Sequence, residues 1–210
     1  MLSRRRFSIA LAAWPLAACT RRQAVRGQPV PAGAKVLAIG DSLTYGTGAP
    51  PEASYPSVLA CLSGWDVVNA GMPGDTSAQA LQRLLPLLDE HQPALVLVSV
   101  GGNDFLRRQP EATTREAIAS LCERARARGA QVMLIAVPRP TLAARFTGSL
   151  DDHPLYAELA KDLRLPLHAR GWADVLQDAA LRSDAIHANA AGYQRFAQSL
   201  HAAARTTGLL

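Results

Sequence analysis

Four short segments combine small residues with nucleophilic, acidic or amide side chains. They are residues 40–44 (GDSLT), 69–77 (NAGMPGDTS), 101–104 (GGND) and 184–187 (DAIH). Together they offer a hydroxyl, carboxylates, a carboxamide and an imidazole, the groups used in nucleophilic and acid–base catalysis. Each segment alone has a simpler interpretation, because Gly-Asp-Ser is a common turn and can also cap a helix or bind phosphate through backbone N–H groups. Chemistry is therefore indicated only if the fold brings the segments together.

The spacing of Asp184 and His187 favours one interaction in particular. Because they are three residues apart, the Asp184 carboxylate can accept a hydrogen bond from Nδ1 of His187, which fixes the tautomer and stabilises the imidazolium. A serine hydroxyl is a poor nucleophile until a base such as histidine takes its proton. The pair therefore has the composition of a general base with its orienting carboxylate.

The elements that must position these segments follow an alternating pattern. Short apolar runs, typical of parallel strands covered on both faces, alternate with amphipathic stretches typical of helices. The alternation predicts an α/β fold, a three-layer α/β/α sandwich with about five parallel strands and ligands at their carboxyl ends. Strands are expected at residues 36–39, 67–68, 95–100, 132–137 and 165–167, and helices near 55–63, 77–90, 112–128, 153–163 and 189–204.

In order and spacing, the four segments resemble the four sequence blocks of the SGNH or GDSL hydrolases, across essentially all of residues 35–205. Within that family, residues 74–77 and 85–88 make the chain most similar to the bacterial multifunctional thioesterases, which are also described as arylesterases and lysophospholipases. The resemblance implies a catalytic triad in which Ser42 is the nucleophile, His187 the base and Asp184 the orienting acid. All four segments then lie at one edge of the sheet, as joint catalysis requires.

The same resemblance implies three donors for the oxyanion of the tetrahedral intermediate. They are the backbone N–H of Ser42, the backbone N–H of Gly74 and the side-chain amide of Asn103. Glycine suits the second position because the backbone must approach the substrate without a Cβ. Asparagine suits the third because it donates a hydrogen bond without adding charge. Simpler roles stay open, since Asp75 with Thr76 or Ser77 can cap the next helix, and Asn189 is expected to cap the last one.

Two stretches depart from the family pattern. His187 is followed by Ala188, where the family more often has proline, a change that removes no catalytic atom. Residues 139–150, which follow the fourth predicted strand at the substrate edge, differ more and leave the acyl-chain preference open. Met72, Pro73 and Leu106 are placed to line an apolar groove for an acyl chain, although packing alone also explains them.

The amino terminus has the pattern of an export signal. A basic stretch over residues 3–7 precedes an apolar run too short to span a bilayer, which predicts a signal peptide over 1–18. Both the twin-arginine pathway and the general secretion pathway accept a signal of this pattern.

The apolar run ends in LAAC, which resembles a lipobox and predicts a diacylglycerol-modified Cys19. A small-residue cleavage site is the alternative. We expect a flexible tether over 19–34, one hydrolase domain over 35–210, and an exported protein of the periplasm or cell envelope, anchored by lipid to a bacterial membrane.

Composition argues against several other classes of protein. The formal charge of +5 depends on Arg4, Arg5 and Arg6, without which 19 basic residues face 17 acidic ones, so nucleic-acid binding is not indicated. Three cysteines with no metal-ligand spacing suggest neither a disulfide framework nor a metal site, and Cys61 and Cys122 are expected to be buried. We expect no cofactor and a monomer.

The sequence therefore predicts a hydrolase that cleaves small-molecule carboxylic esters or thioesters of short to medium acyl chains through an acyl-enzyme. Three alternatives differ in what they require of the sequence. A carbohydrate O-acetyl esterase would use the same fold on another substrate. A non-catalytic envelope lipoprotein would not need the four segments. A flavodoxin-like nucleotide binder would need a glycine-rich phosphate motif after the first strand, which is missing.

Overall fold

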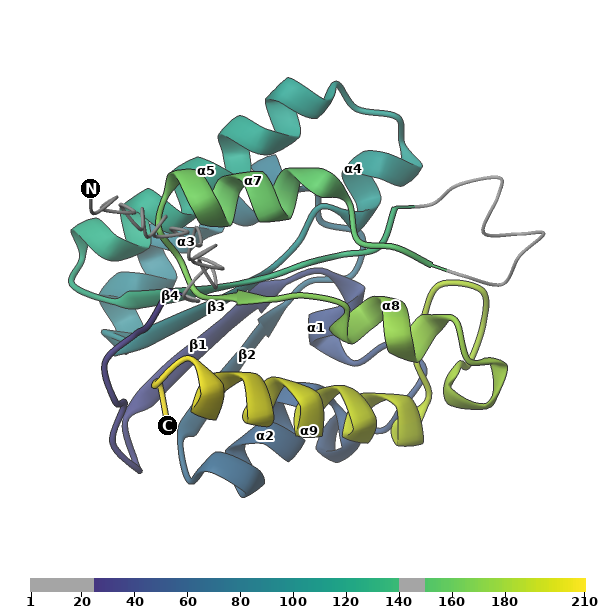
Figure 1. Ribbon diagram of the computed structural model, residues 1–210, viewed down its shortest axis with the longest axis horizontal. Helices are drawn as coiled ribbons and strands as arrows, with labels where there is room; N and C mark the ends of the chain where they lie inside the picture. The colour runs from purple at the N-terminus through teal and green to yellow at the C-terminus, as the bar shows by residue number, and fades with distance from the viewer. Residues whose placement is uncertain (1–24, 140–149) are drawn as a thin grey trace, which may run out of the picture.

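The computed structural model describes residues 25–139 and 150–210. Within them lies a five-stranded parallel sheet of order β2-β1-β3-β4-β5, which confirms the predicted α/β fold (Figure 1). The predicted signal peptide and Cys19 lie outside the described residues. The strands are β1 (Lys35–Gly40), β2 (Asp66–Gly71), β3 (Leu95–Ser99), β4 (Gln131–Ile135) and β5 (Leu167–His168).

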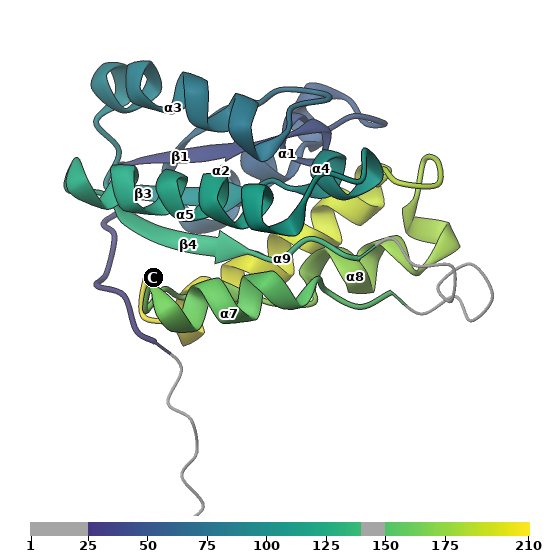
Figure 2. The same ribbon diagram turned by 90° about the horizontal axis from the view of Figure 1, so that it is seen from above.

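Helices cover both faces of this sheet and make the predicted three layers. Figures 1 and 2 show α3, α5 and α7 on one face and α2, α8 and α9 on the other. Two short helices, α1 and α4, follow β1 and β3. The α-helices are α1 (Ser42–Tyr45), α2 (Tyr55–Ser63), α3 (Ser77–His91), α4 (Gly102–Leu106), α5 (Glu111–Ala127), α7 (Pro154–Asp162), α8 (Gly171–Leu176) and α9 (Ala190–Thr206), with 3-10 turns η1 (Pro51–Ala53) and η2 (Ala179–Leu181).

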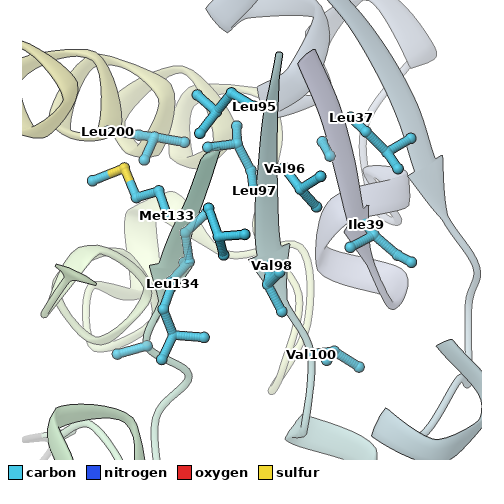
Figure 3. Close-up of a cluster of buried hydrophobic side chains, with 14 of the residues drawn as sticks. Leu37, Ile39, Leu95, Val96, Leu97, Val98, Val100, Met133, Leu134 and Leu200 are labelled. Carbon is cyan, nitrogen blue, oxygen red and sulfur yellow. The ribbon is translucent and has the colours of Figure 1, made fainter. Parts of the chain in front are cut away.

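The central strands are buried on both faces, as their continuous apolar runs predicted. Every residue of β3 is buried, and Figure 3 shows its side chains among those of β1 and β4, with Leu200 of α9 beside Met133. Burial of such side chains contributes roughly 1.5–3 kcal/mol each and anchors the sheet. The loops after the strands are therefore held by a rigid base.

Three expectations need correction. The fifth strand was expected at 165–167 but spans Leu167–His168, because Pro166 has no N–H for the ladder and contributes only its carbonyl, which accepts from the N–H of Leu134. Cys61 is exposed rather than buried, whereas Cys122 is buried as expected. The short helices α1, α4 and α8 were not predicted.

The expected tether does not extend over residues 27–34. Val30 is buried, its N–H donates to the carbonyl of Leu209, and its own carbonyl accepts from Nε1 of Trp65. The N–H of Gly27 donates to the carbonyl of Thr207, the residue that follows the last turn of α9. This segment therefore packs at the edge formed by the amino ends of the strands, opposite the carboxyl ends of β1 to β3 (Figure 1). Among the described residues, no helix is long and apolar enough to cross a bilayer.

Candidate active site

Ser42, His187 and Asp184 meet at the carboxyl edge of the sheet. Ser42 opens α1 directly after β1, and its Oγ lies 3.0 Å from Nε2 of His187. Nδ1 of the same imidazole lies 2.7 Å from Oδ2 of Asp184. Two hydrogen bonds thus link Asp184 and His187, three positions apart, to Ser42, which lies 145 positions before His187 in the sequence. Such a chain suits proton transfer from the serine hydroxyl to the imidazole.

The loop that carries Asp184 and His187 is fixed by its own backbone. Oδ1 of Asp184 accepts hydrogen bonds from the N–H groups of Ile186 and His187, both at 2.8 Å. An antiparallel bridge between Arg182 and Ala188 closes the loop. Ala188 is fully buried, so alanine in place of the family's usual proline leaves the turn closed.

Asn189 holds the end of this loop to α9. Its Oδ1 accepts from the N–H of Gly192, which confirms the predicted helix cap. Its Nδ2 donates to the carbonyls of Ala180 and Arg182 and so ties the loop to the preceding turn. The imidazole is therefore positioned from both ends of the loop.

The Asp184 carboxylate is held in its charged form. Its partial burial raises the pKa, but hydrogen bonds from the His187 ring and from the N–H groups of Ile186 and His187 outweigh burial and lower the pKa below its ordinary value. An ionised carboxylate beside Nδ1 keeps the proton on that nitrogen and leaves Nε2 free to act as a base.

The other two residues expected to bind an oxyanion, Gly74 and Asn103, follow β2 and β3, the strands on either side of β1. Gly74 lies in the loop after β2 with φ at +85°, a left-handed conformation that favours glycine. Asn103 lies on α4 after β3, and one hydrogen of its Nδ2 is donated to the carbonyl of Asp75 at 2.9 Å. The amide has a second hydrogen, so this bond orients the group and leaves a donor available.

Glycine at position 74 is required by backbone conformation rather than by crowding. A Cβ built there would have its nearest neighbour, Nη2 of Arg107, at 3.7 Å, an ordinary contact. In the free protein the positive φ is therefore the reason for glycine, and the expectation that a Cβ would hinder the substrate stays a prediction.

Two buried or partly buried polar residues that support the site were missed from the sequence. Asp104 is buried and accepts from the N–H and Oγ of Ser77, at 2.8 and 2.6 Å, so it joins α4 to the start of α3. Arg83 of α3 donates to Asp75 and to the carbonyl of Gly40. Asp104 lies within the GGND segment, which already indicated a role at the site. No local sequence motif distinguishes Arg83 from other arginines on the helix surfaces.

Thr76 caps α3, as one of the simpler interpretations proposed. Its hydroxyl accepts from the N–H of Gln79, and the Gln79 side chain accepts from the N–H of Thr76 in a reciprocal capping box. This cap sits two residues after Gly74 and fixes the exit of the loop.

Asp41 is a further acidic group at the site with few compensating contacts. It is buried, and its side chain accepts one hydrogen bond from the residues that the structure describes, at 3.0 Å from the N–H of Leu43. Burial raises the pKa of this carboxyl to about 7, against the lowering effects of that hydrogen bond and of His187, while Asp104 and Asp75 raise it further.

Large exposed apolar side chains border the site. Tyr45, Met72, Leu106 and Ile186 are 44 to 54% exposed, and each lies within three residues of Ser42, Gly74, Asn103 or His187. Met72 and Leu106 are thus exposed beside the site, as a groove-lining role requires. Residues 140–149, the remaining candidates for the groove, lie outside the described residues. We name these four side chains the apolar rim.

Two hollows of the described residues lie away from this candidate site. A hollow of about 330 Å³ between α8 and α9, lined by residues such as His168 and Arg195, contains none of the residues above. Over residues 25–139 and 150–210, no group of three or more histidine, cysteine or acidic side chains is arranged to hold a metal ion. Side-chain geometry therefore locates the site at the carboxyl edge.

The sequence is also similar to a known family of hydrolases. The GDSL-like Lipase/Acylhydrolase family matches residues 38–195. The thioesterase 1/protease 1/lysophospholipase L1 of Escherichia coli (strain K12) is 34% identical over 158 residues, 73% of this chain and 75% of that protein. Esterase TesA of Pseudomonas aeruginosa is 40% identical over 110 residues, but this match spans only 55% of its length. A crystal structure of TesA superposes with a TM-score of 0.72 at 28% identity, covering 81% of this chain and 98% of that one.

The titration of Asp41 gives a pH prediction. Because its pKa in the folded state is about 7, against 3.8 ordinarily, the folded protein holds a proton that the unfolded chain loses as pH rises through this window. Stability therefore falls as pH rises towards 7. Replacing Asp41→Asn removes this fall, so the variant should gain roughly 3 kcal/mol over wild type between pH 5 and pH 8.

Urea unfolding of both proteins at the two pH values measures the difference, since other titrating groups affect both equally. A parallel pH dependence of the two free energies of unfolding would show that Asp41 is ionised throughout.

Proposed function

This chain belongs to the GDSL-like lipase/acylhydrolase family and is an esterase of the GDSL/SGNH type, and we propose that Ser42, His187 and Asp184 are its catalytic triad. The observation that carries the proposal is the continuous hydrogen-bonded chain from the Ser42 hydroxyl through the imidazole to the Asp184 carboxylate. Its substrates in this proposal are carboxylic esters or thioesters of short to medium acyl chains.

The geometry supports a two-step acyl transfer. Nε2 of His187 takes the hydroxyl proton as Oγ of Ser42 attacks the acyl carbon, and Asp184 stabilises the imidazolium. The tetrahedral intermediate collapses, and His187 returns the proton to the departing alcohol or thiol. Water then attacks the acyl-enzyme by the same route, which releases the acid and restores the serine.

The negative charge of the intermediate needs fixed donors. In the proposal, the N–H groups of Ser42 and Gly74 and the free amide hydrogen of Asn103 supply them, each contributing about 3 kcal/mol to the transition state. The contact between Asn103 and the Asp75 carbonyl supports this role, because it holds the amide before substrate binds.

Ser42→Ala tests the nucleophile directly. It should lower kcat by at least ~10³-fold and abolish labelling by a fluorophosphonate probe, because no other hydroxyl lies at His187 Nε2 in the described residues. Ser183→Ala is the matched control, since the Ser183 hydroxyl also lies by His187 but donates to its backbone carbonyl and not to its ring.

Labelling should be lost in the first variant and kept in the second. A Ser42→Ala protein that is folded and still labelled would refute the assignment.

The apolar rim supports an acyl chain over an acetyl group. Tyr45, Met72, Leu106 and Ile186 together expose apolar surface beside the proposed nucleophile, where the acyl group of a bound ester extends. Contact with this surface gains at most ~0.8 kcal/mol per buried methylene. An O-acetyl esterase acting on carbohydrate has no use for such a surface, so this alternative is the less favoured one.

A series of aryl esters distinguishes the two substrates. We expect kcat/KM to rise from acetyl to butyryl or hexanoyl, by at most about fourfold per methylene, until the rim is covered. The increase should shrink in Met72→Ser and Leu106→Ser, while acetyl ester turnover changes little.

The same preparations should be assayed on an acetylated oligosaccharide. If acetate is the best ester and the sugar acetate is faster still, the O-acetyl esterase alternative replaces the acyl-chain proposal.

We also propose that the chain is exported to the cell envelope, and that a lipid on Cys19 anchors it. The described structure supports a particular point of attachment. The segment at Gly27 is attached at the amino edge, and α9, about 25 Å long, separates that edge from the His187 loop. In this proposal the anchored end therefore joins the domain at the edge opposite the catalytic residues.

Lipidation is tested in a bacterial host with labelled fatty acid. Wild type should fractionate with membranes and carry the label, whereas Cys19→Ser should do neither, because a hydroxyl cannot form the thioether. The two proteins should have equal activity on a soluble ester. Identical soluble fractions for both would reduce the proposal to a secreted, unanchored enzyme.

A further inference from the structure

Arg83 of α3 contacts two segments of the site at once. Its Nε donates to Oδ2 of Asp75 at 2.7 Å, and its Nη2 donates to the carbonyl of Gly40 at 2.8 Å. Asp75 directly follows Gly74, and Gly40 lies two residues before Ser42. One guanidinium therefore joins the two loops that carry the backbone donors of the proposed oxyanion hole.

The third donor is attached to the same group. The carbonyl of Asp75 accepts from Nδ2 of Asn103 at 2.9 Å, while the Asp75 carboxylate accepts from Arg83. Asp75 is buried and Arg83 is partly exposed, so both contacts are partly shielded from competition by bulk water. Loops after β1, β2 and β3 thus meet in one hydrogen-bonded frame consisting of Gly40, Asp75, Arg83 and Asn103.

A guanidinium is suited to this task because its donors have a fixed planar geometry. The Nε–H and Nη2–H groups of Arg83 cannot move relative to each other, so the distance between its two acceptors is set. A lysine ammonium could pair with the Asp75 carboxylate but could not hold the Gly40 carbonyl in the same relation. Oxyanion donors must lie within about 2.7–3.1 Å of the developing charge, and misplacement by about 1 Å can cost roughly 10²-fold in rate.

We propose that Arg83 is a positioning residue that sets the spacing of the oxyanion hole, acting through Asp75 and the Gly40 carbonyl. The inference rests on the proposed function, because the hole matters only if Ser42 forms a tetrahedral intermediate. Arg83 contacts neither Ser42 nor His187, so it takes no part in proton transfer. Its loss should weaken binding of the transition state and leave binding of the ester nearly unchanged.

The simpler role, an ion pair that only stabilises the fold, makes a different prediction. A partly exposed pair typically contributes little to stability, and its loss would lower the folded fraction without changing turnover per active site. Arg115 provides a matched control. Its guanidinium also bonds two acceptors, Glu158 and Asp162, and its side chain is 33% exposed against 25% for Arg83, but none of its partners belongs to the site.

The test compares Arg83→Met, Arg83→Lys and Arg115→Met with wild type on one aryl ester, with active sites titrated in each. Arg83→Met should lower kcat by roughly 10- to 100-fold with KM changed less than about threefold. The kcat of Arg83→Lys should lie between those of Arg83→Met and wild type, because lysine keeps the ion pair with Asp75. Arg115→Met should match wild type. The rate of inactivation by a fluorophosphonate, which places a tetrahedral oxygen in the hole, should fall in parallel with kcat.

Added methylguanidinium should restore part of the kcat of an Arg83→Ala variant and none of the activity of Asn103→Ala. A kcat for Arg83→Met equal to that of Arg115→Met, after correction for active sites, would overturn the proposal. So would a loss that appears in KM alone. Neither result would affect the triad, which Ser42→Ala tests separately. If Ser42→Ala keeps its activity, the proposed function fails whatever Arg83 does.

Discussion

The alignment of three strand ends is the constraint on which the site depends. Gly40 of β1 is paired with Gly71 of β2 on one side and with Ser99 of β3 on the other, so all three loops leave the sheet at the same level. Two of these ends leave no room for a side chain. A Cβ on Gly40 would lie 2.1 Å from Oγ1 of Thr44, and one on Gly71 would lie 2.1 Å from the N of Tyr45. Helix α1 can therefore begin close to the sheet, and Ser42 lies between the loops from both neighbouring strands.

Much of this arrangement was predictable because it depends on local pattern. The apolar runs of β1, β3 and β4 are buried on both faces, and such runs indicate parallel strands without knowledge of their partners. Once the sandwich is assumed, any polar segment that follows a strand belongs to one edge. The positions of Ser42, Gly74 and Asn103 followed from that rule and from the family resemblance. The long helices were found to within about two residues because their periodicity spans several turns.

The remainder could not be predicted because it depends on contacts between distant residues. The short helices α1, α4 and α8 have four to six residues, too few for a periodic signal, and α8 is fixed by Trp172, whose Nε1 donates to Oγ of Ser99. Arg83 lies 43 residues from its acceptor Gly40. The segment at Val30 resembled a linker by composition, yet it is held by Leu209 at the other end of the chain.

Three carboxyl groups near Ser42 are buried, and their desolvation lowers the stability of the fold while their contacts position the site. The carboxylate of Asp75 is compensated by the guanidinium of Arg83, and that of Asp104 by the N–H and hydroxyl of Ser77. Asp41 accepts one backbone N–H at the start of α1 and has no cationic partner among its contacts in the described residues. Desolvation is therefore least compensated at Asp41, and burial raises the pKa of this carboxyl to about 7.

A neutral side chain in that place would be easier to bury. Aspartate at the N-cap instead holds the first turn of α1 against Leu43, and so fixes the direction in which Ser42 leaves the strand. A poorly compensated buried group of this kind is expected at functional sites, because the requirements of chemistry there outweigh those of the fold. The buried apolar sheet makes the arrangement tolerable, since its contribution to stability does not depend on the polar frame above it.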